Sequence, residues 1–212
     1  MATNRRLPVY FLLDTSGSMV GEPIESLRVG LRSLVSALRQ DPHALETLSL
    51  SLLTFDREVK VILPLTSLEE LQLPRIDCPD SGPTNLGMAL KVLRERIELE
   101  VRRSGDSRDW RPLLFVFTDG GASDRQEFNS QMKDIKSVGF ASIIGCAAGP
   151  KAKVSDLEQF CEHVVKLETM DGRSLASYFQ WVSTAVSSGN VSMGANPDMR
   201  LPPPPAEINV VI

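Results

Sequence analysis

The sequence predicts an α/β fold: an open, mostly parallel twisted sheet with one antiparallel edge strand and helices on both faces. Short apolar runs rich in strand formers alternate along the chain with longer segments of helical periodicity. This alternation is typical of parallel strands joined by right-handed crossover helices. One connection, Asp56-Arg57, is too short for a crossover, so the strand after it must return antiparallel at a sheet edge. The 212 residues suit a single α/β domain.

The first strand and the first helix come from the N-terminal 38 residues. Val9–Leu13 is apolar throughout, which is typical of a central strand buried on both faces. Pro23 lies near the start of a helix, where its missing N–H does no harm. Apolar residues then recur at helical spacing from Ile24 to Leu38, which predicts a helix lying against one face of the sheet.

Two strands and a second helix follow. Residues 48–55 alternate at first and then become continuously apolar, and residues 59–63 form the antiparallel edge strand. Prolines and a glycine make residues 65–83 a long loop that ends just before Thr84. Helical periodicity then resumes and continues through residues 85–101.

The second half of the chain repeats the alternation of strand and helix. Its apolar runs are again short, and the segments between them have helical spacing. The predicted elements are strands at 113–118, 140–147 and 164–167 and helices at about 124–138, 154–161 and 173–187.

The chain divides into two parts, a domain at residues 1–188 and a proline-rich tail at 189–212. Four consecutive prolines, at 202–205, exclude helix and central strand and favour extended polyproline geometry. The last five residues, 208–212, are apolar enough to add as a strand to a sheet edge. The alternative is a mobile tail. The sequence leaves both alternatives open.

Composition excludes several classes of protein. Hydrophobic residues make up 42% and charged residues 24%, as in ordinary soluble domains, and a formal charge of −4 gives no affinity for nucleic acid. No apolar segment approaches the roughly 20 residues that span a bilayer. The three cysteines, Cys78, Cys146 and Cys161, form no Cys-x-x-Cys pair and are expected to be reduced thiols. We therefore expect a cytoplasmic protein.

Polar side chains gather at the end of the first strand. Asp14 ends the apolar run, and Ser16 and Ser18 follow around Gly17. In an open α/β sheet, ligands bind beyond the carboxyl ends of the strands. Carboxylate and hydroxyl oxygens suit Mg²⁺, Mn²⁺ or Ca²⁺ rather than zinc or copper. The alternative is that Asp14 and the serines cap the following helix, because Asp and Ser are good N-cap residues.

Two later stretches complete this arrangement. Leu113–Thr118 is a second apolar strand that ends at an aspartate and a glycine, and a threonine hydroxyl precedes the second helix. Asp14, Ser16, Ser18, Thr84 and Asp119 together resemble the metal-ion-dependent adhesion site (MIDAS) of von Willebrand factor A (VWA) domains. The resemblance extends over residues 7–188 and implies a Rossmann-like VWA fold with these five residues as metal ligands.

The resemblance also implies a function. MIDAS domains bind an aspartate or glutamate of a partner protein through the metal, so we expect a Mg²⁺-dependent interaction adaptor, with Mn²⁺ or Ca²⁺ as alternatives. The blocks FLLDTSGSM and PTNLGMAL are most similar to bacterial TerY-like proteins, which are encoded beside a kinase and a phosphatase. That similarity implies those two partners and a stress-response, tellurite-resistance setting. The sequence departs from the family pattern at Pro83 and at Gly121-Ala122.

An enzyme is the alternative class, namely a metal-dependent phosphatase or hydrolase that uses Asp14 and Asp119. A nucleophilic-aspartate phosphatase would have a second acid where this chain has Ser16. The sequence also has no G-x-x-x-x-G-K-[ST] phosphate loop. The two histidines, His43 and His163, are expected in a turn and in a late connection, where neither is placed to act as a base. We therefore expect a binding module and no enzymatic activity.

A local basic cluster follows the second helix. It consists of four arginines around one tryptophan: Arg102, Arg103, Arg108, Arg111 and Trp110. One interpretation is that these cations lie at a helix C-terminus, where they are favoured, and on a solvated loop. The other is a docking patch.

Overall fold

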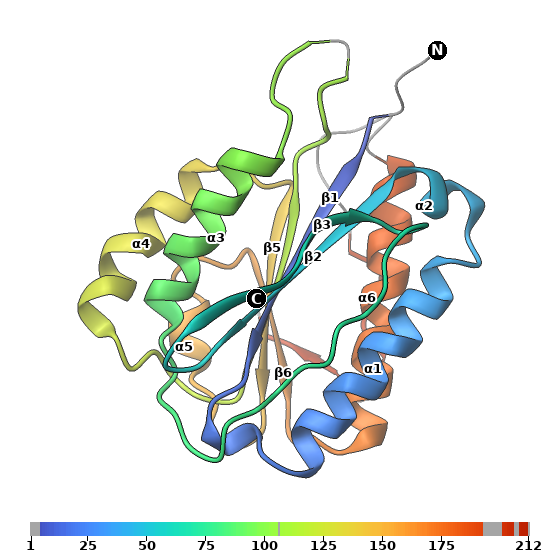
Figure 1. Ribbon diagram of the computed structural model, residues 1–212. Helices are drawn as coiled ribbons and strands as arrows, with labels where there is room; N and C mark the ends of the chain where they lie inside the picture. Colours follow the sequence, from blue (N-terminus) through green and yellow to red (C-terminus); the bar gives the residue numbers. More distant parts are fainter. Residues whose placement is uncertain (1–4, 106, 193–200, 206–207, 212) are drawn as a thin grey trace.

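The protein has a seven-stranded sheet with helices on both faces (Figure 1). The computed structural model describes residues 5–105, 107–192, 201–205 and 208–211. The order of the strands is β3-β2-β1-β4-β5-β6-β7. The strands are β1 (Leu7–Asp14), β2 (Leu48–Phe55), β3 (Val59–Ser67), β4 (Leu113–Thr118), β5 (Ser142–Ala148), β6 (His163–Leu167) and β7 (Asn209–Val210).

The pairing of the strands confirms the predicted fold class. Five neighbouring strands pair in parallel, in the order β2, β1, β4, β5 and β6. β3 returns antiparallel to β2 and forms one edge, as the short Asp56-Arg57 connection predicts. The short strand β7 pairs antiparallel with β6 and forms the opposite edge.

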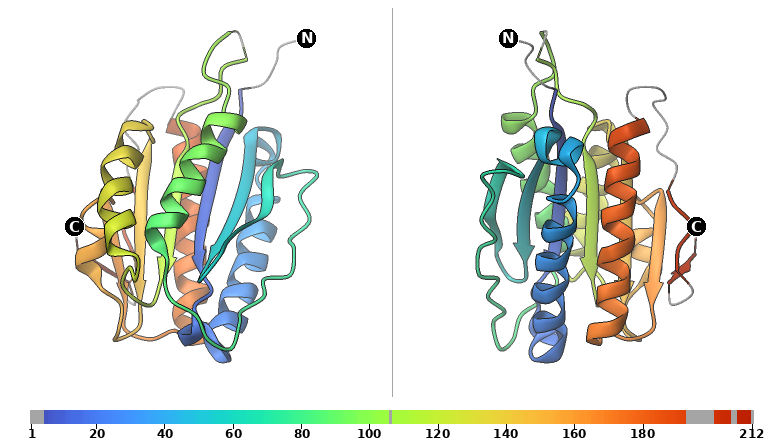
Figure 2. Two further views of the ribbon diagram at one scale, coloured as in Figure 1. Left: turned by 60° about the vertical axis from the view of Figure 1, so that its left-hand side comes forward. Right: turned by 90° about the vertical axis from the view of Figure 1, so that its right-hand side faces the viewer.

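The helices form two layers. α1 and α6 lie side by side on one face of the sheet, and α3 and α4 lie on the other (Figures 1 and 2). Within the described residues, no helix has the length and apolarity needed to cross a membrane. The helices are α1 (Glu22–Leu38), α2 (Pro42–Thr47), α3 (Leu86–Glu100), α4 (Arg125–Ser137), α5 (Val154–Leu157) and α6 (Gly172–Ser192), with a 3₁₀ turn at Gly17–Met19.

Strand β1 divides the interior into two cores. All eight of its residues are buried. Phe11 and Leu13 belong to the core under α1 and α6, and Tyr10 and Leu12 belong to the core under α3 and α4. This is the alternation that a strand produces when both faces of its sheet are covered. Phe11 also stacks on Phe115 of β4, with ring centroids 5.1 Å apart.

Helix α5 is shorter than the sequence predicts. It ends at Leu157 instead of continuing through 161. The chain has to rejoin the sheet there, because the N–H of Glu162 donates to the carbonyl of Ile143 at 2.9 Å and β6 begins at the next residue, His163. His163 therefore lies at the start of a strand, and its predicted place in a connection is wrong.

A short helix, α2, lies where the sequence predicts a turn. The Asp41 carboxylate accepts hydrogen bonds from the backbone N–H groups of His43 and Ala44, at 3.0 and 3.3 Å, and so caps the first turn. His43 is consequently in a helix, just before β2 begins. The pair Asp-Pro is typical of a helix start. A helix of six residues, however, is too short for its apolar periodicity to be recognised in the sequence.

The C-terminal residues lie against the domain. The indole N–H of Trp181 in α6 donates to the carbonyl of Pro202 at 3.0 Å. Ile208 is buried in the core under α1 and α6, and Val210 lies opposite Val165 of β6. Helix α6 continues past residue 188 to Ser192. The division of the chain into a domain at 1–188 and a tail at 189–212 stays a prediction.

We expect a chain that ends at Ser192 to fold but to be less stable by about 2 kcal/mol, because it loses the burial of Ile208. It should also self-associate, since the unpaired edge of β6 would be exposed to a second copy. Urea unfolding and sedimentation at several protein concentrations measure the two effects. A monomeric truncated chain with unchanged stability would contradict this prediction.

Candidate metal centre

The predicted ligand residues lie at one edge of the sheet, beyond the ends of β1 and β4. Asp14 is the last residue of β1, and Asp119 directly follows Thr118, the last residue of β4. The two strands are parallel neighbours, with Leu13 opposite Phe117. Their carboxyl ends therefore meet, and the helices that follow them lie on opposite faces of the sheet. That arrangement forms the usual ligand crevice of open α/β folds.

Hydrogen bonds join four of the five residues in one network. The Asp14 carboxylate accepts from the backbone N–H of Ser16 at 2.8 Å and from the Thr118 hydroxyl at 2.6 Å. The Ser18 hydroxyl donates to the Asp119 carboxylate at 2.8 Å. The Ser16 and Ser18 hydroxyl oxygens are 3.2 Å apart. The loop after β1 thus brings both serine hydroxyls between the two carboxylates.

Thr84 reaches the same place from the long loop before α3. A Cβ atom placed on Gly120 would lie 3.2 Å from the Thr84 hydroxyl oxygen, so this hydroxyl is close to the chain just after Asp119. Ser123 holds the backbone of Thr84: its hydroxyl accepts from the Thr84 N–H at 3.1 Å, and its N–H donates to the Thr84 carbonyl at 2.8 Å. The structure therefore brings all five predicted residues together.

The two carboxylates are deeply buried, with exposed fractions of 0% for Asp14 and 3% for Asp119. Neither forms an ion pair with a described residue. Burial raises the pKa of Asp14 to about 6, although the hydrogen bonds from Thr118 and Ser16 oppose that rise. Burial also raises the pKa of Asp119, against its serine hydrogen bond and the positive charge of Lys151.

This donor set fits a hard divalent cation. Two carboxylates and three hydroxyls offer only oxygen, which Mg²⁺, Mn²⁺ and Ca²⁺ prefer. Among the described residues, no group of three or more His, Cys, Asp or Glu side chains could hold a metal ion. A metal at this edge would therefore depend on the hydroxyls as well as on the carboxylates.

The alternative role for this loop, capping the next helix, is wrong. α1 begins at Glu22, and its N-cap residue is Gly21, which has a φ of 91°. Asp14 lies well before that point and accepts from Ser16 instead. Ser16 does precede the 3₁₀ turn, but its side chain makes no capping hydrogen bond.

Gly17 is required by a close contact. A Cβ atom there would lie 2.9 Å from the Cα of Ser81, and the Gly17 N–H donates to the carbonyl of Gly82 at 3.4 Å. Gly17 is not among the glycines with positive φ. The glycine thus lets the long loop before Thr84 lie directly on the serine-bearing loop.

Sequence reasoning missed three polar residues that support the centre. Thr118 donates to Asp14, and the Thr15 hydroxyl donates to the Asp56 carboxylate at 2.9 Å. Asp56 in turn accepts, through its carbonyl, the N–H of Asn85 just before α3. Thr118 ends a predicted strand, and Thr15 and Asp56 each follow one within two residues, which is the signal that could have revealed them.

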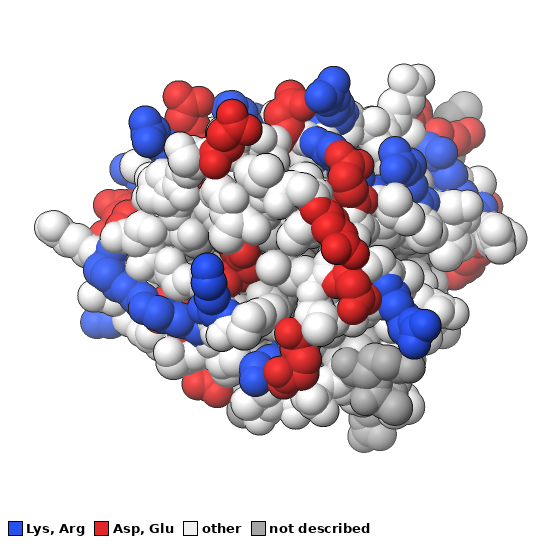
Figure 3. All heavy atoms as spheres, turned by 90° about the horizontal axis from the view of Figure 1, so that it is seen from below, with Lys and Arg blue, Asp and Glu red and all other residues white. Residues whose placement is uncertain are grey.

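Charge is unevenly distributed over this edge of the molecule. Figure 3 views the edge directly, with a row of basic side chains along the left and acidic side chains down the right half. The exposed residues Lys151 and Lys153 follow β5 here, and the Lys153 N–H donates to the Gly120 carbonyl at 3.2 Å. A partner that approaches Asp119 therefore also approaches positive charge.

Comparison with protein families identifies the fold. The model of the von Willebrand factor type A domain matches residues 9–173, which is most of the chain. The chain belongs to the von Willebrand factor type A domain family. Comparison with curated protein sequences gives no match.

Solved structures share the VWA fold at low sequence identity. The proximal thread matrix protein 1 of the mussel byssus, with a zinc-occupied MIDAS motif, is 19% identical over 87% of this chain and 48% of its own, with a TM-score of 0.62. A von Willebrand factor type A protein of Catenulispora acidiphila is 15% identical, with coverages of 87% and 43% and a TM-score of 0.63. This chain spans about half the length of the mussel structures that it matches.

Proposed function

We propose that this VWA domain is a divalent-metal-dependent protein-interaction module, with the metal held by Asp14, Ser16, Ser18, Thr84 and Asp119. One observation supports the proposal most directly: two buried carboxylates lie together with no ion-pair partner among the described residues. Buried charges normally require a counter-charge or a metal. Three hydroxyls lie beside these carboxylates and supply further oxygen donors.

In this proposal the metal binds the partner, and the residues around it orient the two carboxylates. A bound divalent ion, for which we propose Mg²⁺ with Mn²⁺ or Ca²⁺ as alternatives, would act as a Lewis acid for an aspartate or glutamate of the partner. Ser16 and Thr118 orient Asp14, and Ser18 orients Asp119 from an exposed position on the rim. The zinc-occupied MIDAS motif of the mussel protein supports a divalent metal in this fold.

We also propose that the domain is not an enzyme, in preference to a phosphatase or hydrolase that uses Asp14 and Asp119. Both oxygens of Asp14 accept hydrogen bonds, and its side chain is fully buried, so a substrate cannot reach it as a nucleophile. His43 and His163 lie just before or at the start of parallel strands, which is the edge of the sheet opposite the centre. Neither histidine can serve as a base there.

The biological setting is proposed from the resemblance of two sequence blocks. FLLDTSGSM and PTNLGMAL resemble TerY-like proteins, so we propose a cytoplasmic, bacterial stress-response adaptor linked to phosphorylation and tellurite resistance. Its partners would then include a kinase and a phosphatase. Capture of partners from a lysate with Mg²⁺, and again with a chelator, tests the interaction. Phosphatase assay of the purified chain tests the enzymatic alternative.

Thr84→Ala is expected to weaken metal-dependent partner binding more than it weakens the fold. The Thr84 hydroxyl makes no hydrogen bond with a described residue, so its loss should cost about 1 kcal/mol of stability or less. If the hydroxyl couples metal binding to partner binding, affinity should fall by about 5- to 150-fold. Calorimetry with a captured partner, with and without chelator, measures the change.

Thr184→Ala is the matched control, because Thr184 is exposed on α6 and donates only to the Gln180 carbonyl of its own helix. It should leave partner affinity unchanged. Equal affinity for wild type and Thr84→Ala, with and without chelator, would show that the partner binds elsewhere.

A further inference from the structure

A hollow lies at the edge of the sheet opposite the metal centre, where β1 and β4 begin. Its volume is about 300 Å³. We name it the arginine pocket after the residues that line it: Arg5, Arg102, Arg103, Arg108, Arg111 and Trp110. Val101, Pro112 and Val138 also line it, so the pocket combines cationic and apolar groups.

The arginine pocket concentrates positive charge. Residues 5–6 and 101–112, which form most of the pocket, contain six arginines, at positions 5, 6, 102, 103, 108 and 111, and two aspartates, at positions 106 and 109. Their formal charge is +4, whereas the formal charge of the whole chain is −4. Asp106 is outside the described residues. A local cluster of positive charge on a protein whose net charge is negative attracts anionic ligands.

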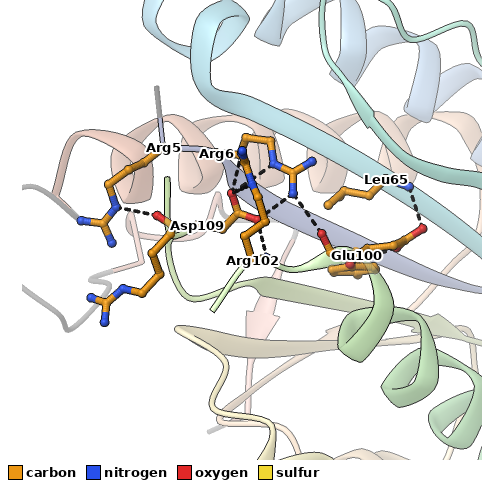
Figure 4. Close-up of polar contacts among 8 residues, drawn as sticks. Arg5, Arg6, Leu65, Glu100, Arg102 and Asp109 are labelled. Carbon is orange, nitrogen blue, oxygen red and sulfur yellow. Dashed lines mark hydrogen bonds and ion pairs between the residues drawn. The ribbon is translucent and has the colours of Figure 1, made fainter. Parts of the chain in front are cut away.

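Asp109 neutralises only part of this charge. Its side chain is fully buried and accepts from Arg6 at 2.7 and 3.0 Å and from Arg102 at 3.0 and 3.2 Å. Figure 4 shows both arginines converging on Asp109 while the guanidinium of Arg5 points away from it. This carboxylate thus pairs with two arginines, and within the described part of the chain no carboxylate pairs with Arg5, Arg103, Arg108 or Arg111.

Two further arginines bind the end of α4. Arg103 donates to the Val138 carbonyl at 3.4 Å, and Arg111 donates to the Gly139 carbonyl at 3.2 Å. These two arginines therefore lie at a helix C-terminus, as one interpretation of the cluster expects, but the helix is α4 and not α3, which precedes them in the chain. A guanidinium has five N–H donors, so both keep donors for another ligand.

Of the remaining arginines, Arg5 lies over the Trp110 ring and Arg108 lines the same pocket. The guanidinium carbon of Arg5 lies 5.5 Å from the centre of the indole ring, and the Nε–H of Arg5 donates to the Arg108 carbonyl at 2.9 Å. Among the described residues, the Arg108 side chain has no hydrogen-bond or ion-pair partner. An aromatic ring next to an available guanidinium can hold an apolar side chain that has a carboxylate beside it.

We propose that the arginine pocket binds an acidic segment of a partner protein, with an apolar side chain against Trp110 and neighbouring carboxylates on the arginines. The guanidinium fork matches the geometry of a carboxylate. The backbone groups around the pocket come from the carboxyl ends of α3 and α4, which present carbonyls. The carbonyls of Val138 and Gly139 accept from Arg103 and Arg111, so the pocket offers an anion guanidinium donors and not backbone N–H groups.

The position of the arginine pocket adds to the role of the domain. β1 has eight residues, which span about 25 Å between the pocket and the metal centre. Two partners can therefore bind at once, one at each edge of the sheet. The inference does not depend on the proposed metal function, because no residue of the pocket belongs to the metal centre.

The test uses two synthetic peptides, Glu-Glu-Phe-Glu-Glu and Gln-Gln-Phe-Gln-Gln, with pyrophosphate as a comparator. The chain has two tryptophans, so Trp181→Phe leaves Trp110 as the only indole to report binding by fluorescence. We expect the glutamate peptide to bind at least about tenfold more tightly than the glutamine peptide and to weaken as salt rises. Calorimetry with the unmodified chain gives the same comparison without Trp181→Phe.

Arg108→Gln is expected to weaken binding of the glutamate peptide about fivefold. Arg32→Gln, which removes the same charge from an exposed position on α1, should leave binding unchanged. Equal binding of the two peptides, or an equal effect of both substitutions, would overturn the proposal. Loss of peptide binding on adding chelator would place the peptide at the metal centre and also overturn it. Binding of pyrophosphate without binding of the peptide would assign the pocket to phosphate ligands instead.

Discussion

Mg²⁺ is expected to raise the melting temperature of the wild-type VWA domain, and Asp14→Asn is expected to abolish that rise together with metal-dependent partner binding. Asparagine keeps the size of the side chain and an oxygen that can accept the Ser16 N–H, but it removes one of the two negative charges of the centre. At a Mg²⁺ concentration 100 times the Kd, mass action stabilises the wild type by about 2.7 kcal/mol. Calorimetric melting with and without Mg²⁺ measures this loss.

Without metal, the same substitution should leave the protein at least as stable as wild type. Asp14 is fully buried, Asp119 lies close by, and no described residue forms an ion pair with either carboxylate. Burying an unpaired charge costs free energy, which the substitution removes. The order of the two melting temperatures should therefore reverse on adding Mg²⁺, and a carboxylate with a purely structural role would not produce that reversal.

Asp156→Asn provides the control. Asp156 is also a buried aspartate near this edge of the sheet, but it is paired with Arg125 at 2.6 Å and is not in the donor set. Its substitution should lower stability and preserve the response to Mg²⁺. A wild-type chain that shows no response to saturating Mg²⁺, Mn²⁺ or Ca²⁺, or an Asp14→Asn variant that responds fully, would rule out the proposed site.

Gly87→Ala should destabilise the domain by about 3 kcal/mol. Gly87 lies in the first turn of α3, where α4 passes against it. A Cβ atom at Gly87 would be 2.2 Å from the backbone nitrogen of Phe128 and 2.6 Å from its Cα. Backbone atoms cannot rotate away, so the two helices would have to separate. Asp124 would then lose its hydrogen bonds from the N–H groups of Gly87 and Met88, at 3.0 and 2.8 Å.

The sign of this effect separates packing from helix propensity. Alanine is a better helix former than glycine by about 1 kcal/mol, so propensity alone predicts stabilisation by Gly87→Ala. Gly172→Ala, in the first turn of α6, is the matched control, because its nearest neighbour would be the Ser26 hydroxyl at 3.9 Å. Chemical denaturation compares the two variants. A Gly87→Ala variant as stable as Gly172→Ala would show that α3 and α4 are not packed as closely as described.

The sequence by itself determined the fold class and the order of the main strands and helices. The apolar composition of runs such as Val9–Leu13 and Leu113–Thr118 predicts that these strands are buried. The length of one connection predicts that β3 runs antiparallel to β2. It also placed the candidate ligands, because residues that follow buried parallel strands must meet at one edge. Asp14 and Asp119 are 105 positions apart, yet each could be found from its own strand.

Only the tertiary structure decided which side chains contact each other across that edge. The hydrogen bond from Thr118 to Asp14 and the contact between Gly87 and Phe128 join residues far apart in the chain. Local patterns cannot report such contacts, because they depend on how two elements pack. Asp109 is an example: in the sequence it is one acid among arginines, but in the structure it is buried and binds Arg6, which is 103 positions away in the chain.

The C-terminal residues show the same limit. Their composition allowed either a mobile tail or an added strand, and the sequence contains no feature that selects between the two. The outer edge of β6 selects the strand, because its backbone groups pair with β7 and the neighbouring core buries Ile208. The C-terminal segment therefore forms a strand because the folded domain offers it a partner strand and a core, which the isolated segment lacks.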